Sequence, residues 1–187
     1  SLESKGKALK SYLSRGEKLS VVQAFQIIKQ VLFAVKEVHE AGFLHLDIQD
    51  GNVFIKGSLS AEDNLVSLVD FGAARPVCED GLCPVIRDRA LFSTMGFESP
   101  EIVGHNDGTL RLGAEADLYS VGYLLLLMLT GKRYTQRELD SANIGLYLSK
   151  RKLKKLNCPA HMADKGHQII SKALKKTPGE RYHSCGE

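Results

Sequence analysis

One stretch of the sequence constrains the fold more than any other: the run from Ala114 to Thr130 is apolar on nearly every side of a helix. A helix without a polar face is stable only when other elements surround it, so it belongs in the middle of a core. Gly131 follows directly and is suited to end the helix in a left-handed conformation. The sequence therefore predicts a central buried helix over 114–130.

Neither a membrane-spanning helix nor a secretory signal is indicated by the sequence. The most continuous part of the apolar run, Val121 to Leu129, is far shorter than the roughly 20 residues that a bilayer-spanning helix needs. The chain does not open with a basic region followed by an apolar stretch, as a secretory signal does. We expect a soluble, cytoplasmic protein with no membrane segment in these residues.

A second helix has a clear start and end in the sequence. Ser20 and Gln23 are spaced as a capping box, apolar residues then recur with helical spacing, and Gly42 ends the pattern. A last helix is expected over about 164–176, where Pro178 stops it. These helices provide most of the expected core.

Short β-branched runs interrupt the helical pattern. They predict a β-hairpin over 52–69, whose two strands are separated by a polar turn. Residues 73–113 show no sustained period, which predicts a long functional loop. The fold class is therefore α+β, mainly α, with residues 1–187 in one domain.

Charge and cysteine content say little about partners. The net charge is +3, and we interpret the densest basic run, Lys150 to Lys155, as a solvated face rather than a nucleic-acid site. The cysteines lack CxxC spacing and a matching histidine pair, so we expect free thiols and no zinc site. They are Cys78, Cys83, Cys158 and Cys185.

Polar residues stand directly before and after the predicted hairpin, although its apolar strands do not require them for packing. Asn52 opens the first strand and Asp70 follows the second, so the hairpin brings an amide oxygen and a carboxylate together. Hard oxygen ligands, few in number, suit Mg²⁺, which keeps waters and binds phosphate oxygens. Asp47, close by in the sequence, could then orient or deprotonate a hydroxyl nucleophile.

Several motifs in this order resemble those of protein kinases, serine/threonine kinases in particular. A single such motif arises by chance, but the whole series on the expected elements is specific, and it extends from about Leu9 to Arg181. The motifs are His45-x-Asp47-x-x-x-x-Asn52, Asp70-Phe71-Gly72, Ser99-Pro100-Glu101, Ala116 to Gly122, and Thr177 to Arg181.

The resemblance implies a catalytic loop over 45–52 and an activation segment over 70–101. In that loop Asp47 would accept or orient the substrate hydroxyl. Gln49 stands where serine/threonine kinases usually carry a lysine that touches the γ-phosphate of ATP, and Asn52 completes the catalytic set.

The same resemblance implies ATP and Mg²⁺ as cofactors. Asn52 and Asp70 would hold Mg²⁺ on the ATP phosphates. Phe54 and Val69 would form the floor of the adenine pocket, and Asp70 would also contact the nucleotide through the metal. The implied reaction is phosphoryl transfer from ATP to serine or threonine of a protein substrate.

Other matched positions are implied to be structural. Glu101 and Arg181 would form a buried ion pair that anchors the activation segment, and Asp117 would bind the backbone of the catalytic loop. Phe71 would pack in an internal hydrophobic column. His45 is interpreted as a core histidine that braces the loop.

The sequence departs from the kinase pattern at informative positions. Leu46 stands where many regulated kinases carry an arginine that receives a phosphate of the activation loop, so we expect activity that does not depend on such phosphorylation. Gln49 lacks the positive charge of lysine, which predicts a slower reaction or a pseudokinase. Thr94 favours serine/threonine over tyrosine specificity.

A kinase also needs a glycine-rich phosphate loop and a lysine on a strand, and neither motif occurs in these 187 residues. We therefore expect the large C-terminal lobe with the small lobe absent. Its partners would be the missing N-terminal lobe and a protein substrate. Alone, the chain is expected to be inactive and to bind ATP weakly.

Two alternatives stay open. In the first, the chain belongs to a pseudokinase or serves as a binding module, an interpretation supported by Gln49 and Leu46. In the second, it belongs to a phosphotransferase that acts on aminoglycosides or choline, because those enzymes share similar loops. Ser99-Pro100-Glu101 and Arg181 favour the protein kinases over this second class.

Overall fold

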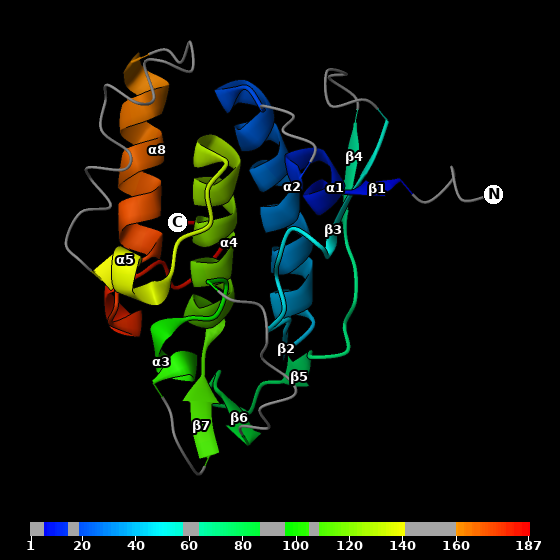
Figure 1. The fold of residues 1–187 in the computed structure, drawn as a ribbon. Helices are drawn as coiled ribbons and strands as arrows, with labels where there is room; N and C mark the ends of the chain where they lie inside the picture. The colour runs from blue at the N-terminus through cyan, green and yellow to red at the C-terminus, as the bar shows by residue number, and fades with distance from the viewer. Residues whose placement is uncertain (1–5, 15–18, 58–63, 87–95, 105–108, 141–159) are drawn as a thin grey trace.

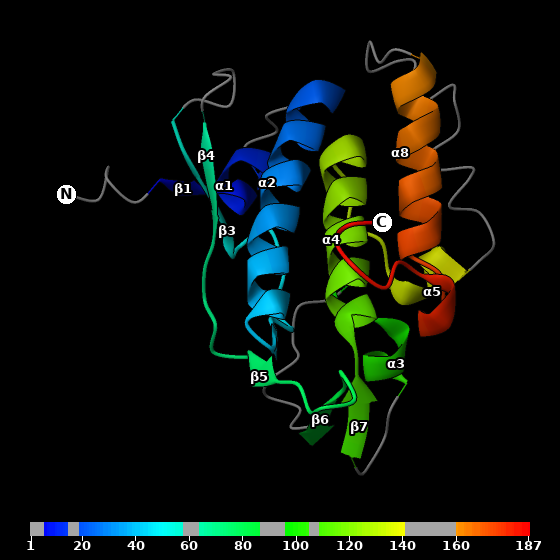
Figure 2. The ribbon, with the colours of Figure 1, turned by 180° about the vertical axis from the view of Figure 1, so that it is seen from behind.

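Long helices lie side by side in the computed structural model, which describes residues 6–14, 19–57, 64–86, 96–104, 109–140 and 160–187 (Figure 1). The middle helix is α4, and both views show α2 on one side of it and α8 on the other (Figures 1 and 2). Short strands lie beside α2 and at the end of the helical layer near β7 (Thr109–Leu112). The helices span Val21–Glu40 (α2), Ala114–Thr130 (α4) and Ala160–Ala173 (α8).

Helix α2 begins at the predicted capping box. The Ser20 hydroxyl accepts the Gln23 amide at 3.2 Å, and the Gln23 side chain accepts the Ser20 amide at 2.8 Å. Each partner satisfies a backbone donor that the first turn would leave free, which contributes about 1 kcal/mol to helix stability. At the other end Gly42 has φ +80°, as expected of the residue that stops the helix.

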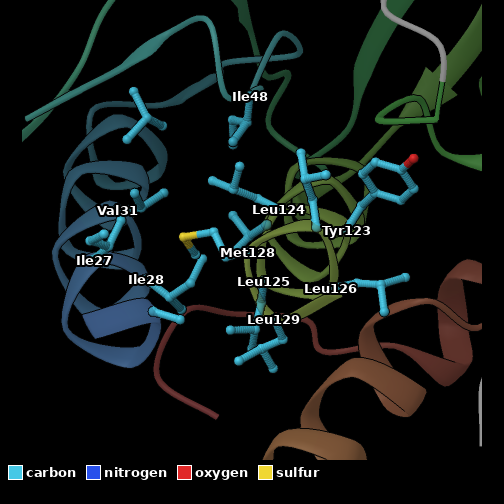
Figure 3. Close-up of a cluster of buried hydrophobic side chains, with 14 of the residues drawn as sticks. Ile27, Ile28, Val31, Ile48, Tyr123, Leu124, Leu125, Leu126, Met128 and Leu129 are labelled. Atoms are coloured by element: carbon cyan, nitrogen blue, oxygen red, sulfur yellow. The ribbon is translucent and has the colours of Figure 1, made fainter. Parts of the chain in front are cut away.

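Helix α4 is buried along almost its whole length, which confirms the predicted central helix. Figure 3 shows Ile28 and Val31 of α2 turned toward the side chains of α4, and Ile27 belongs to the same buried cluster. Burial of a leucine-sized side chain contributes about 1.5–3 kcal/mol, so the contact between α2 and α4 is a main source of stability. Gly131 has φ +65° and ends α4 as predicted.

The predicted hairpin is present and packs against α2. Strand β3 (Val53–Lys56) pairs antiparallel with β4 (Leu65–Leu68), with Val53 opposite Leu68. The side chain of Gln30 on α2 accepts the backbone amide of Val66 at 3.0 Å, which fixes β4 on the helix. A strand that the sequence did not reveal, β1 (Lys7–Ala8), pairs with the other edge of β3 and leads into α1 (Leu9–Ser14).

The expectation of one irregular loop over 73–113 was wrong for its described residues. Strand β2 (Phe43–Leu44) pairs with β5 (Arg75–Pro76), and β6 (Cys83–Ile86) pairs with β7 (Thr109–Leu112). Between them lies the one-turn helix α3 (Pro100–Val103). These strands are too short to show a period, and each partner is distant in sequence. Thr94 lies outside the described residues.

The last long helix ends earlier than predicted, at Ala173 instead of residue 176. Beyond it, the Arg181 guanidinium binds the carbonyls of Lys175 and Lys176 at 2.7 and 3.0 Å, so these two residues belong to the turn that Arg181 holds. This turn after α8 continues into the 3-10 helix Pro178–Glu180.

Helix α5 (Gln136–Asp140) precedes the undescribed stretch 141–159, which contains the basic run 150–155 and Cys158.

The described residues hold three of the four cysteines of the chain. Within that range no group of three or more His, Cys, Asp or Glu side chains could hold a metal ion. Cys78, Cys83 and Cys185 are free thiols. No helix there has both the length and the apolar character needed to cross a membrane.

Helices α4 and α8 approach so closely at Gly122 that a substitution there is a sensitive test of the packing. A β-carbon at this position would lie 2.5 Å from the β-carbon of Ala173. We expect Gly122→Val to lower the free energy of unfolding by about 2 kcal/mol, measured by urea titration, because the helices must move apart. Gly179→Val is the control, since a β-carbon at Gly179 meets no atom within 4 Å. Equal stability of both variants would contradict the proposed close packing.

Candidate active site

The loop between β2 and β3 is closed by hydrogen bonds around Asp47. One carboxylate oxygen of Asp47 accepts the Gln49 side-chain amide at 2.8 Å, and the other accepts the Asn52 side-chain amide at 2.7 Å. The Asn52 amide nitrogen also donates to the Asp47 carbonyl at 2.9 Å. These bonds occupy the side-chain nitrogen of Asn52, so the side-chain oxygen, Oδ1, is the atom available as a ligand.

The hairpin brings Asp70 back to this loop, as the sequence predicted. The amide of Val69 donates to the carbonyl of Asn52 at 2.9 Å, which places the start of the Asp70-Phe71-Gly72 motif beside Asn52. Asp70 is exposed, has φ +65°, and accepts the Gly72 amide at 3.2 Å through Oδ1. One exposed carboxylate and one amide oxygen of a largely buried side chain fit Mg²⁺, which keeps most of its waters.

Asp47 lies in surroundings that favour proton acceptance. Partial burial raises the pKa of its carboxyl group, and the negative charge of Asp70 adds to this effect. The hydrogen bonds from Asn52 and Gln49 and the nearby His45 act in the opposite direction without cancelling it. A raised pKa brings a carboxylate closer to the range in which it works as a general base.

His45 is fully buried and supports the loop from behind. Its Nδ1 accepts the amide of Asp47 at 3.3 Å, and its ring centroid lies 4.9 Å from that of Phe71. Burial lowers the pKa of His45, so the ring is kept neutral. The bracing role expected for His45 fits this geometry. Phe71 contacts His45 and is 52% exposed in this chain, and its place in an internal hydrophobic column stays a prediction.

Asp117, on the first turn of α4, ties this loop to the core. Its carboxylate is 0% exposed and accepts the backbone amides of His45 and Leu46, both at 2.8 Å. It also contacts Nε2 of His39 at 2.8 Å. The backbone anchoring implied for Asp117 is confirmed, whereas His39 carried no signal in the sequence because its partner is so distant along the chain.

Glu101 and Arg181 form the expected ion pair. Two guanidinium nitrogens of Arg181 bind the two carboxylate oxygens of Glu101 at 2.8 and 2.6 Å. The Arg181 side chain is fully buried and stacks over the ring of Tyr119, 5.0 Å from its centroid. Such a two-point contact fixes orientation as well as distance, so it holds α3 against the turn after α8.

A second ion pair at the loop was missed by the sequence analysis. The buried carboxylate of Asp50 accepts Nη2 of Arg133 at 2.7 Å, and the Arg133 guanidinium lies 5.6 Å from the centroid of the Phe97 ring. This contact joins loop 45–52 to the residues after α4. Neither partner belongs to a motif, so only the fold reveals the pair.

The residues expected to contact adenine lie near the same end of the hairpin. Phe54 lies on β3 and Val69 directly follows β4, and both are half-buried. Their place under an adenine ring stays a prediction. Apolar cavities of about 140 and 380 Å³ lie elsewhere, between α2, α4 and α8, with Ile28, Leu125 and Ile169 in the walls of both.

The contact between His39 and Asp117 should make stability depend on pH. Burial opposes the charge on the ring, but hydrogen bonds with Asp117 and Cys185 and the negative charge of Asp117 outweigh it and raise the pKa of His39 to about 9. The unfolded chain releases this proton near the ordinary pKa of 6.5. The contribution is therefore complete below pH 6.5 and is lost as the pH rises toward 9.

We expect the free energy of unfolding to fall by at most about 1.4 kcal/mol per pH unit across this window. His39→Gln should flatten that decline in urea titrations made from pH 6 to pH 10. His167→Gln, which changes a histidine of α8 outside this contact, is the control. A His39→Gln profile as steep as that of the parent chain would contradict the assignment.

Known serine/threonine kinases match two thirds or more of this chain. Serine/threonine-protein kinase PLK4 of Nematostella vectensis is 27% identical over 185 residues, which is 99% of this chain and 17% of the relative. Death-associated protein kinase 2 of Homo sapiens is 32% identical over 130 residues, 67% of this chain and 31% of the relative. The chain thus spans less than a third of either kinase.

A solved structure shows the same fold. A crystal structure of the Rad53 kinase domain and SCD2 in complex with AMPPNP superposes with a TM-score of 0.66 at 21% identity, covering 97% of this chain and 62% of the other. Residues 3–185 match the sequence profile of the protein kinase domain. With its polar loop, its returning aspartate and its Glu101–Arg181 pair in place, the chain belongs to the protein kinase family.

Proposed function

We propose that the full-length protein containing this chain transfers the γ-phosphoryl group of ATP to serine or threonine of a protein substrate. The observation that carries the proposal is the closed loop in which Asp47 is held by Asn52 while Asp70 returns beside it. Its relatives are serine/threonine kinases, and a related structure was solved with AMPPNP. The chain would supply the large C-terminal lobe of the domain.

Each residue of the loop would have a separate task. The carbonyl oxygen of Asn52 and the carboxylate of Asp70 would hold Mg²⁺, which neutralises charge on the phosphates when it is bound. Asp47 would accept a hydrogen bond from the substrate hydroxyl and thereby orient it for attack. Phe54 and Val69 would support the adenine ring from the side of the hairpin.

Gln49 is the residue that argues for slow chemistry. Its side-chain amide donates to Asp47 at 2.8 Å, so it competes with a substrate hydroxyl for one carboxylate oxygen. It also brings no positive charge to a reaction in which electrostatic stabilisation of the transferred group supplies most of the rate. A pseudokinase or binding module is therefore the second candidate. Membership of the protein kinase family gives no support to an aminoglycoside or choline substrate.

The central test is phosphoryl transfer by the full-length protein with and without Asp70. With labelled ATP, Mg²⁺ and a generic protein substrate, we expect Asp70→Asn to lower the rate by about a hundredfold or more, because a metal ligand loses its charge. Glu37→Gln, at an exposed position of α2, is the control and should keep the parental rate. Full activity of Asp70→Asn would contradict the metal assignment. Labelled aminoglycoside in place of labelled protein would support the small-molecule alternative.

Gln49→Lys tests whether the missing charge limits the rate. We expect kcat to rise by about tenfold, because an ammonium group near the γ-phosphate stabilises the transition state more than an amide does. Gln168→Lys, which adds the same charge at an exposed position of α8, should leave kcat unchanged. No transfer by the parent together with none by Gln49→Lys would favour the pseudokinase.

A further inference from the structure

Arg133 is held from the buried side of the chain, yet much of its side chain faces outward. Its Nη2 donates to the buried carboxylate of Asp50 at 2.7 Å, and its guanidinium lies 5.6 Å from the centroid of the Phe97 ring. The side chain is nevertheless 45% exposed. Within the described residues these are its only side-chain partners, so most of its N–H donors are free to bind a ligand.

The backbone next to Arg133 is fixed as well. The Tyr123 hydroxyl on α4 accepts the amide of Tyr134 at 2.8 Å and donates to the carbonyl of the same residue at 2.9 Å. The Tyr123 ring also packs against Phe97, with the two centroids 4.8 Å apart. Arg133 therefore has a defined position before a ligand binds, which lowers the entropy that binding must remove.

These contacts place Arg133 at the edge of the candidate active site. Asp50 lies in loop 45–52, which also carries Asp47, and Phe97 leads into the Ser99-Pro100-Glu101 motif. Arg133 is thus joined through Asp50 to the loop at which the substrate hydroxyl is proposed to bind.

A second cation stands next to Asp50. The amide of Lys10 donates to the Asp50 carbonyl at 2.9 Å, and the Lys10 side chain is exposed. In the described part of the chain no carboxylate forms an ion pair with Lys10. Two exposed cations therefore flank one buried carboxylate, and this excess of positive charge favours an anionic ligand.

We propose that Arg133 determines substrate specificity: its free donors bind an anionic side chain of the protein substrate, a carboxylate or a phosphorylated residue, and Lys10 adds positive charge to the same subsite. The inference rests on the proposed function and names its substrate class. A planar guanidinium binds two oxygens of a carboxylate or phosphate at once, which sets orientation as well as distance. Asp50 positions Arg133 from the buried side.

Synthetic peptides test this preference with the full-length protein. Each peptide carries one acceptor serine among neutral residues, and glutamate is moved through the positions on either side of it, with glutamine as the uncharged match. We expect glutamate at one position or more to raise kcat/KM about fivefold over glutamine, as a half-exposed charge pair allows. Phosphothreonine at the same positions shows which anion is preferred. Equal kcat/KM for all three residues at every position, or a preference for lysine in their place, would overturn the subsite.

Substitutions separate recognition of the substrate from support of the loop. Arg133→Gln should bring the ratio of kcat/KM for anionic and glutamine peptides to about one, and Lys10→Gln should lower it in part. Asp50→Asn leaves the guanidinium in place and should keep the ratio. Lys29→Gln, which removes one positive charge at an exposed position of α2, is the matched control and should also keep it. A purely structural role would lower kcat/KM for all peptides alike, so an unchanged ratio in Arg133→Gln would overturn the proposal.

Peptide binding tests the subsite without relying on transfer. In the absence of ATP, labelled peptides with glutamate or phosphothreonine should bind the full-length protein more tightly than glutamine peptides, as measured by fluorescence anisotropy, and Arg133→Gln should remove the difference. Added salt should reduce it, because exposed charges are screened. Absence of transfer together with this difference would contradict the proposed function and support the subsite. Absence of both would overturn both.

Discussion

The buried carboxylate of Asp117 is the interaction on which the site depends most. It extends from the central helix and accepts the amides of His45 and Leu46, so two consecutive residues of the loop are held by one group. A carboxylate buried this completely needs several hydrogen bonds to offset its desolvation, and the His39 ring supplies a further one. The loop and the charge therefore stabilise each other. Removal of either leaves buried polar groups without partners, which costs about 1–3 kcal/mol for each.

Much of this arrangement could be predicted from the sequence because local rules govern it. The capping box at Ser20, the left-handed glycine after α4 and the apolar character of that helix each depend on residues a few positions apart. The convergence of Asn52 with Asp70 follows from the same logic, since a hairpin must return its second strand to the start of its first. The Glu101–Arg181 pair could be predicted only because both residues stand in motifs that resemble those of kinases.

The parts that escaped prediction depend on contacts between segments that no motif connects. Asp50 with Arg133 and His39 with Asp117 join residues 83 and 78 positions apart, and neither Arg133 nor His39 is set apart by its neighbours in the sequence. Strand β6 also contains Pro84, which cannot donate to a ladder and argues against a strand when read alone. Among the described residues β6 pairs with β7 in a two-stranded sheet, and β7 is too distant along the chain to be recognised as its partner from the sequence.

The two described non-glycine residues with unfavourable backbone conformations are stabilised in different ways. Leu46 and Asp70 are the described non-glycine residues with positive φ, at 62° and 65°, and they flank the site from opposite sides. The unfavourable backbone conformation of Leu46 is offset by the hydrogen bond from its amide to Asp117 and by the buried apolar residues around it. Asp70 is exposed, and in the described part of the chain its carboxylate accepts the nearby amide of Gly72. Strain at Leu46 is offset by the contacts that surround it, whereas the exposed side chain of Asp70 has no comparable packing. The loop that holds Asp47 is thus the more strongly anchored side of the site, and Asp70 is its more exposed side.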